Sequence, residues 1–258
     1  MNKVLIISDL HVGHVGGLCH PDHIHNDNQQ RAWDYFWKGI LENKPFTHVI
    51  ANGDLLDGKG VKNAVEQIIT DRQQQAEVCI KILKEINRVN KQPINYAFIR
   101  GTPAHVAQDG EQWEDIVAKD FINNGSKKPL IDNTLLLDIG GVQFDCRHKI
   151  GKSSVPWGRS TPIIRAAMWK AIGESLDFTV CADIFIRSHI HYFVFVEMMG
   201  LTMLSTPALQ YWSGYGAREC EGITDFGFLV AEIQNKKITK WIKHIARQPI
   251  IKDKVIKI

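Results

Sequence analysis

Five short segments of the chain carry side chains that can bind a metal ion or transfer a proton. In sequence order they are Asp9-Leu10-His11, Gly53-Asp54, Gly101-Thr102-Pro103-Ala104-His105, His148 and His189-Ile190-His191. Most of them follow a short apolar run that is typical of a buried strand. Oxygen and nitrogen ligands presented from separate strand ends are what a two-metal hydrolytic site requires. The ordered set, more than any single segment, predicts such a site.

Asp9 and His11 lie two residues apart at the end of the strand expected over residues 4–8. In strand geometry the side chains at positions i and i+2 point to the same side, so a carboxylate and an imidazole can converge on one ion. The same geometry applies to His189 and His191, which follow the strand expected over residues 183–187. Either pair alone is a common accident of sequence.

Asp54 follows the strand expected over residues 47–51. Each oxygen of its carboxylate can hold a separate cation, so Asp54 can bridge two ions; taken alone, it reads as an Asp/Gly turn. Asp57 is expected to be a capping residue or a hydrogen-bond acceptor behind the ligands. His148 ends the strand expected over residues 142–147, although a lone histidine is usually a satisfied surface or core residue.

Two other stretches are similar to an H-x-H metal motif and to a P-loop, but we do not assign these functions to them. His23-Ile24-His25 has no preceding strand to fix it, so we expect a flexible rim of the site there, and His14 lies close enough to the first segment to contact substrate. Gly151-Lys152-Ser153 resembles the end of a P-loop, but Cys146 stands where that motif needs a glycine. Nucleotide binding of the P-loop kind is therefore excluded.

The composition is that of an ordinary globular protein, with 44% hydrophobic and 23% charged residues. A length of 258 residues suits one large α/β domain spanning residues 1–258. The net charge of +3, with a pI near 8.5, does not by itself argue for nucleic acid, but it does not repel a phosphate-bearing substrate.

The five cysteines form no CxxC pair, so we expect reduced thiols rather than a zinc ribbon or a disulfide framework. The first apolar run is too short for a signal-peptide core, and no run approaches the length of a membrane span. These features predict a cytoplasmic location without membrane association. The sequence does not indicate the oligomeric state.

Strands and helices alternate in the first half of the chain, and hairpins follow in the second. Helices are expected at residues 29–43, at 63–90 with a kink or break at 70–75, at 111–123 and at 161–174. Further strands are expected at 94–99, 133–139, 192–197, 201–205, 226–233 and 238–245. This order predicts a four-layer αββα sandwich, in which two mixed β-sheets pack face to face with helices outside.

Taken together, residues 9–191 resemble the calcineurin-like metallophosphoesterase superfamily. Its motifs are D-x-H, G-D-x-x-D, G-N-H-[DE], a lone H and G-H-x-H, in that order. The first, second and fourth motifs are intact here, as Asp9 to His11, Gly53 to Asp57, and His148. The order of the motifs and their position at strand ends make the resemblance specific.

Two motifs depart from the family pattern. Ser188 replaces the glycine of the last motif, which we regard as minor because that glycine provides backbone room rather than a ligand. In the third motif Thr102 replaces the asparagine, and Pro103 and Ala104 precede His105, a form that looks similar to phage-type members.

The resemblance implies two divalent metal ions. Asp9, His11 and His191 would hold one ion, His148 and His189 the other, with Asp54 between them. In the family the asparagine of the third motif also binds the second ion. Here either the Thr102 hydroxyl would supply a weaker oxygen ligand or a water molecule would fill the asparagine's position. The second ion would therefore bind more loosely. Mixed carboxylate and imidazole ligation suits manganese first, with iron, zinc or nickel as alternatives.

The function implied is a metal-dependent phosphoesterase in which the two ions generate a hydroxide nucleophile and His105 protonates the leaving group. We favour phosphodiesters of nucleotides or nucleic acid as substrates, with a phosphomonoesterase acting on proteins or small molecules as the alternative. A catalytically weak, metal-binding interaction scaffold is the hypothesis of a different class, and only the altered third motif favours it.

Substrate recognition is less well defined. Arg159 and Arg165, in and after a loop that leads into a helix, are equally consistent with a phosphate contact and with solvated surface charge. The stretch Tyr211 to Gly216 fits an aromatic wall for a base or a packed loop. The lysines between Lys236 and Lys243, with Arg247, are expected to form a solvated sheet edge.

Overall fold

The computed structural model describes residues 1–59, 66–108, 111–153, 155–211, 214 and 224–247. Its first sheet has six strands in the order β13-β12-β1-β2-β3-β6. The consecutive strands β1 (Asn2–Ile7), β2 (His48–Ala51), β3 (Asn95–Ile99) and the edge strand β6 (Ile131–Asp132) are parallel. The antiparallel pair β12 (Asp225–Gln234) and β13 (Lys237–Arg247) completes the sheet beside β1.

The second sheet has five strands in the order β10-β11-β9-β8-β7. The hairpin of β7 (Thr134–Ile139) and β8 (Val142–Arg147) is confirmed around Gly140 and Gly141, whose positive φ angles suit the tight turn. Strand β9 (Ile184–Arg187) runs parallel to β8 and to β11 (Leu201–Ser205), and β10 (Val194–Met198) pairs with β11 antiparallel. Both sheets are therefore mixed.

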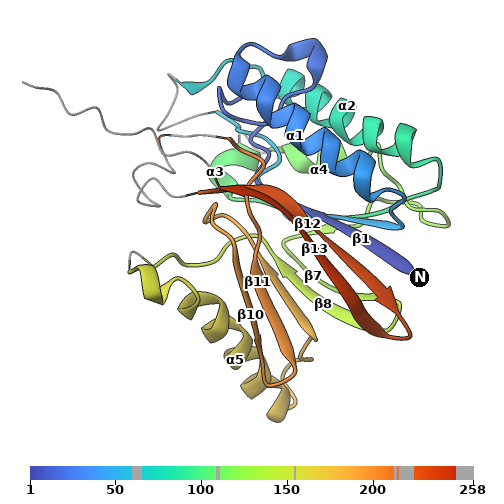
Figure 1. Cartoon of the computed structure of the whole chain (residues 1–258), viewed down its shortest axis with the longest axis vertical. Helices are drawn as coiled ribbons and strands as arrows, with labels where there is room; N and C mark the ends of the chain where they lie inside the picture. Colours follow the sequence, from blue (N-terminus) through green and yellow to red (C-terminus); the bar gives the residue numbers. More distant parts are fainter. Residues whose placement is uncertain (60–65, 109–110, 154, 212–213, 215–223, 248–258) are drawn as a thin grey trace, which may run out of the picture.

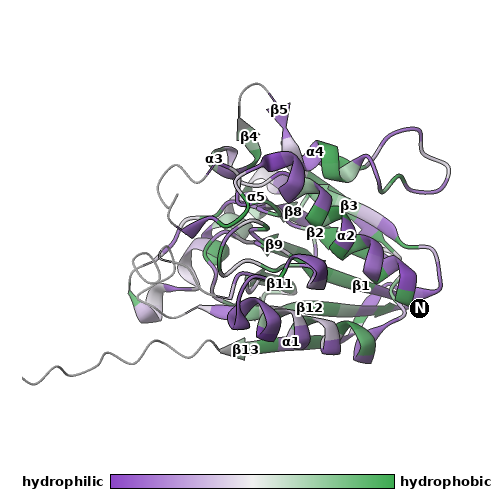
Figure 2. Ribbon diagram, turned by 90° about the horizontal axis from the view of Figure 1, so that it is seen from above, coloured by the Kyte–Doolittle hydropathy of each residue, from purple (hydrophilic) through white to green (hydrophobic). Residues whose placement is uncertain are grey.

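Side chains on alternate sides of β1 belong to two separate cores. Leu5 and Ile7 pack with the helices that cover the first sheet, whereas Val4 and Ile6 pack against the second sheet. Such a division requires a sheet that is covered on both faces. The strands β1 and β12 are accordingly mostly hydrophobic, whereas α1 and α2 carry both hydrophilic and hydrophobic residues (Figure 2).

Helices cover the outer face of each sheet. The helices α1 (Asp27–Asn43), α2 (Arg72–Asn90) and α4 (Trp113–Ala118) contribute to the core on the first sheet, and α5 (Thr161–Ser175) packs on the second (Figure 1). The predicted αββα sandwich is thus confirmed. The shorter elements are α3 (Pro103–Val106), the 3₁₀ turns at Pro21–His23 and Pro156–Gly158, and the two-residue strands β4 (Ala107–Gln108) and β5 (Glu111–Gln112).

Two helices are shorter than the sequence predicts. Helix α2 begins at Arg72, after the N-cap Asp71, so the helix starts where the sequence predicts a break, at residues 70–75. Residues 66–70 are not α-helical, and residues 60–65 lie outside the described chain. Helix α4 ends at Ala118 rather than at residue 123, because the Asn123 side chain binds both backbone polar groups of Tyr96 and holds the chain against β3.

Several other expectations concern the surface and the thiols. The described cysteines, Cys19, Cys79, Cys146 and Cys181, are free, and Cys220 lies outside the described residues. No helix in the described part of the chain is both long enough and apolar enough to span a bilayer. The lysines of β13 lie along an exposed sheet edge, as expected, and apart from Tyr211 and Gly214 the stretch 211–216 is not described.

Candidate metal centre

All five ligand-bearing segments meet at one edge of the sandwich. The loops after the parallel strands β1, β2 and β3 carry Asp9, Asp54 and Thr102, because the carboxyl ends of parallel strands lie at the same edge of a sheet. The loops after β8 and β9 bring His148 and His189 to the same place from the second sheet. Side chains from both sheets thus face one another.

The backbone reaches this arrangement through left-handed conformations. Strand β1 ends at Ile7 and β9 at Arg187, so the predicted i, i+2 strand geometry does not apply beyond them; that explanation of the convergence is wrong. Positive φ angles between 44° and 76° are found instead at Asp9, His11, Asp54, His189 and His191. Residues other than glycine rarely adopt this conformation, and where they do so it is often at a functional site.

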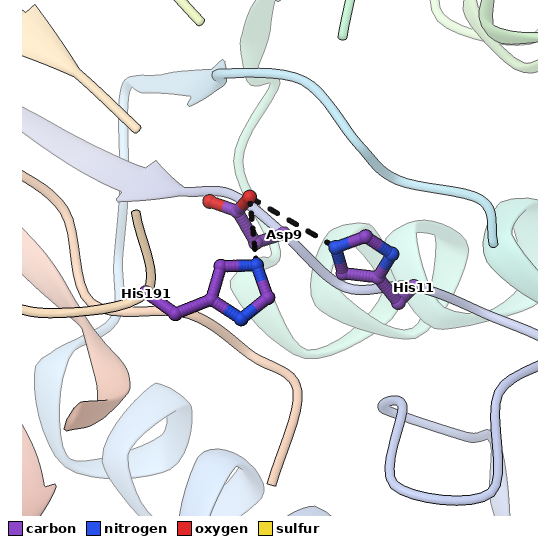
Figure 3. A group of neighbouring side chains, drawn as sticks. All are labelled: Asp9, His11 and His191. Atoms are coloured by element: carbon purple, nitrogen blue, oxygen red, sulfur yellow. Dashed lines mark ion pairs between the residues drawn. The ribbon is translucent and has the colours of Figure 1, made fainter. Parts of the chain in front are cut away.

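The first cluster consists of Asp9, His11 and His191. The Oδ1 atom of Asp9 lies 3.3 Å from Nε2 of His191 and 4.0 Å from Nε2 of His11 (Figure 3). All three side chains are buried, and each offers a ligand atom within 4.8 Å of the others. Ligand atoms at such separations leave room for an ion at the roughly 2.0–2.2 Å bond lengths typical of zinc with nitrogen and oxygen.

The second cluster is built around Asp54. Its Oδ2 atom lies 2.9 Å from Nε2 of His148 and 3.7 Å from Nδ1 of His189. The Thr102 hydroxyl lies 3.1 Å from the same carboxylate oxygen and 3.2 Å from Nδ1 of His189. The two clusters adjoin, since Oδ1 of Asp9 is 3.9 Å from Nε2 of His148.

Several buried ligand atoms have no hydrogen-bond partner among the described residues. They are Oδ1 of Asp9, both ring nitrogens of His11 and Nε2 of His148, whose contacts are ion pairs with neighbouring side chains, such as the 2.9 Å pair between Nε2 of His148 and Asp54. Buried polar atoms are almost always paired, because leaving them unpaired costs free energy. A bound cation would satisfy Oδ1 of Asp9 and the Nε2 atoms of both histidines, so the donor set fits a metal ion.

Backbone carbonyl groups fix two of the imidazoles. Nδ1 of His148 donates to the carbonyl oxygen of Asn52 over 2.7 Å, and Nδ1 of His105 donates to that of Asp57 over 2.8 Å. Because a carbonyl oxygen only accepts, each Nδ1 carries the proton, and Nε2 is left free to bind a metal or to exchange a proton.

The pKa values follow from burial and the close charges. Burial raises the pKa of Asp9, but the charges of His148 and His191 outweigh it and bring the value to about 2. Burial lowers the pKa of His11 to about 4. Burial also disfavours charged His148, yet Asp54 and Asp9 raise its pKa to about 10. Asp9 is therefore ionised at neutral pH, and His148 is protonated until a bound cation displaces the proton on its Nε2.

The half-buried His105 lies beside the first cluster, with its ring centroid 4.7 Å from that of His11. Burial acts to lower its pKa, but the charge of Asp54, the hydrogen bond to the Asp57 carbonyl and the charge of Asp57 together outweigh burial and raise the pKa above its usual value. Asp57 lies behind the ligands, as expected: its Oδ1 is 3.4 Å from Nδ1 of His11, and its Oδ2 accepts a hydrogen bond from Gln67.

The predicted substrate contacts have different environments. His14 is buried, with Nδ1 accepting from the backbone N–H of Gly16 and Nε2 lying 3.0 Å from Oε2 of Glu66, so neither ring nitrogen remains for a substrate. The Arg159 guanidinium lies 4.5 Å above the ring of Tyr192, and Arg165 is exposed on α5. Phosphate binding by either arginine stays a prediction.

Sequence reasoning missed Glu114, a buried residue of α4. Its Oε1 accepts the backbone N–H of Leu55 over 2.9 Å, and its Oε2 accepts that of Gly101 over 2.7 Å. Burial raises the pKa of this carboxyl to about 7. One side chain thus ties the loop of Asp54 to the loop of Thr102. An acidic residue in the first turn of a helix is common, so no sequence signal distinguishes Glu114.

We expect Glu114→Ala to destabilise the protein by about 2 kcal/mol or more, because it leaves two backbone N–H groups without their acceptor inside the protein. Urea denaturation followed by circular dichroism measures the loss. Glu77→Ala, on the exposed side of α2, is the control and should leave the midpoint unchanged. Equal midpoints for the two variants would show that Glu114 does not hold the loops.

No protein-family model and no curated protein matches the chain. Among solved structures it is similar to wild-type Vps29 complexed with zinc from Entamoeba histolytica, at 17% identity over 95% of this chain and 97% of that chain, with a TM-score of 0.45. Vps29 from Cryptosporidium parvum gives 13% identity, 95% and 97% coverage and a TM-score of 0.45. A novel archaeal phosphodiesterase gives 15% identity, 93% and 98% coverage and a TM-score of 0.47. Similarity at this level does not define the function of this chain.

Proposed function

We propose that the chain is a metal-dependent phosphoesterase of the calcineurin-like metallophosphoesterase superfamily that binds two divalent ions. The observation that supports this most strongly is the set of buried, convergent ligand atoms without hydrogen-bond partners among the described residues, on Asp9, His11 and His148. A folded chain that keeps such atoms loses free energy unless a cation pairs with them.

Each ligand has a proposed role. Asp9, His11 and His191 hold the first ion; His148, His189 and the Thr102 hydroxyl hold the second; and Asp54 lies between them. When bound, two such ions lower the pKa of water and neutralise charge on the phosphoryl oxygens. The ligand types suit manganese, with iron, zinc or nickel as alternatives.

His105 is proposed as the general acid. Its Nδ1–H is engaged by the Asp57 carbonyl, so Nε2 is the nitrogen that can pass a proton to the leaving oxygen. The charge of Asp54 favours the protonated imidazolium that this role needs. No side chain has to form a covalent bond with the substrate.

The proposed substrate is a phosphodiester of a nucleotide or nucleic acid, and a phosphomonoester of a protein or small molecule is the alternative. The net charge of +3 tolerates either anion. A protein-interaction scaffold is the second candidate function, and one observation favours it. Large apolar side chains on and around α5 are exposed, including Trp157 at 87%, Trp169 at 67% and Phe178 at 83%.

A substrate panel assayed after chelation and re-addition of single metals tests the proposal. The panel contains mononucleotides, cyclic nucleotides, dinucleotides, single-stranded DNA and RNA, and nitrophenyl mono- and diesters. We expect hydrolysis of at least one ester with manganese and none after chelation, measured as released product and by elemental analysis of the protein. A chain that hydrolyses none of these esters with any of the metals would be the scaffold.

A further inference from the structure

We propose that Ser188 is a positioning residue for the second metal ion, acting through a buried hydroxyl network of Ser8, Asn52, Ser188 and Thr206; this presupposes the two-ion site proposed above. The network lies directly behind the metal centre. Ser8 precedes Asp9, Asn52 precedes the Gly53-Asp54 turn and Ser188 precedes His189. It therefore joins three of the loops that carry ligands.

The contacts within the hydroxyl network are short and fully buried. The amide Nδ2 of Asn52 donates to Oγ of Ser188 over 2.6 Å. Oγ of Ser188 lies 2.7 Å from Oγ1 of Thr206, which in turn lies 2.6 Å from Oγ of Ser8. The exposed fraction of each of the four residues is 0 or 1%. Water therefore does not compete for these hydrogen bonds.

One arrangement of protons satisfies every hydroxyl in the network. Asn52 donates to Ser188, Ser188 to Thr206, Thr206 to Ser8, and Ser8 to the carbonyl oxygen of Pro207 over 3.3 Å. The Thr206 hydroxyl also has a second acceptor, the carbonyl oxygen of Arg187 at 3.3 Å, so its single proton can point to Ser8 or to Arg187. Every hydroxyl of the network is paired, and Oδ1 of Asn52 is its one side-chain polar atom without a partner among the described residues; within such a network each bond strengthens its neighbours.

Ser188 connects this network to both imidazoles of the second cluster. Its side chain holds Asn52, whose carbonyl oxygen accepts from Nδ1 of His148 and so sets the direction of that ring. Its backbone N–H donates to the carbonyl oxygen of His148 over 2.8 Å, and the next residue is His189. Losing the Ser188 hydroxyl would therefore loosen Asn52, which orients His148, and would remove the bond to Thr206 that holds the residue before His189.

This position carries glycine in the family motif that the sequence resembles, and glycine has no side chain to make these contacts. The serine here coincides with the other departure, Thr102, whose neutral hydroxyl is a weaker ligand than an amide oxygen. Because Thr102 is a weak ligand, the binding of the second ion depends more on how firmly His148 and His189 are held.

Manganese titration of wild type, Ser188→Ala and Thr206→Val tests the inference, with free manganese followed by electron paramagnetic resonance. We expect the two variants to bind the second ion about 10- to 100-fold more weakly and the first ion as wild type does. Their kcat should fall at limiting manganese and recover at saturating manganese. Ser205→Ala is the matched control, because Ser205 is also buried but donates to the Tyr192 carbonyl outside the network.

The outcomes are distinguishable. A wild-type protein that binds no second ion would overturn the proposed function itself. A wild type that binds two ions, with variants that bind both equally well, would overturn only the role of Ser188. Equal weakening of both ions, together with a lower melting temperature, would show general structural support instead of positioning, and would overturn it too.

Discussion

The Asp54→Asn variant is expected to lose about a thousand-fold in kcat, because in the proposed site Asp54 would lie between two ions that together supply several kcal/mol of transition-state stabilisation. Asparagine is the informative replacement. Asp54 has φ +50°, a conformation that asparagine tolerates and alanine does not, so the fold is preserved. Asparagine also keeps an oxygen for the backbone N–H of Thr102, which lies 2.6 Å from Oδ1 of Asp54. The substitution removes the charge, the shared carboxylate and the oxygen that accepts the Thr102 hydroxyl.

Product release under saturating manganese, together with metal content by elemental analysis, measures this effect. The control is Asp34→Ala, an exposed carboxylate on α1 that should keep wild-type turnover. Wild-type turnover and two bound ions in Asp54→Asn would mean that Asp54 does not bridge. Turnover lost with metal content unchanged would restrict its role to chemistry after binding.

The His105→Ala variant is expected to discriminate between leaving groups. General acid catalysis contributes about a hundred- to ten-thousand-fold when the leaving alkoxide needs a proton. A nitrophenolate leaves without one, so its ester should lose less than about ten-fold, whereas a nucleotide or alkyl ester should show the full loss. Because His105 is assigned to neither ion, its removal should leave the metal content unchanged.

The two classes of ester are compared through kcat/KM in the same buffer. His25→Ala, which removes an exposed histidine of the rim, is the matched control and should change neither value. Equal losses on both esters would remove His105 from the acid role. A loss of bound metal would instead make it a ligand.

The sequence was sufficient to predict which strand ends carry the site. The apolar runs before Asp9, Asp54 and His189 are short and end at polar residues, and parallel strands place such ends at one edge. The alternation of helices and strands followed by hairpins was likewise enough for the αββα layers. These features are local, so a single sequence records them.

Features that depend on distant contacts could not be predicted. Nothing near Glu114 reveals that its carboxylate will meet two loops, one of them 59 residues away at Leu55. Ser188 reads from the sequence as a minor replacement of glycine, because Asn52 becomes its neighbour only when the two sheets pack and Thr206 only when β11 pairs with β9. The left-handed backbone of the ligands has a similar cause, since it follows from how each loop leaves its strand.

That left-handed backbone also restricts which amino acids can serve as ligands. Aspartate and histidine are among the few residues that tolerate such angles, whereas glutamate and cysteine, which also bind metals, do so less readily. The choice of side chains at Asp9, His11, Asp54 and His191 thus reflects chain conformation as well as metal chemistry. Among the imidazoles proposed as metal ligands, His148 has no such restriction, so it is the natural place to introduce a thiolate for a softer ion.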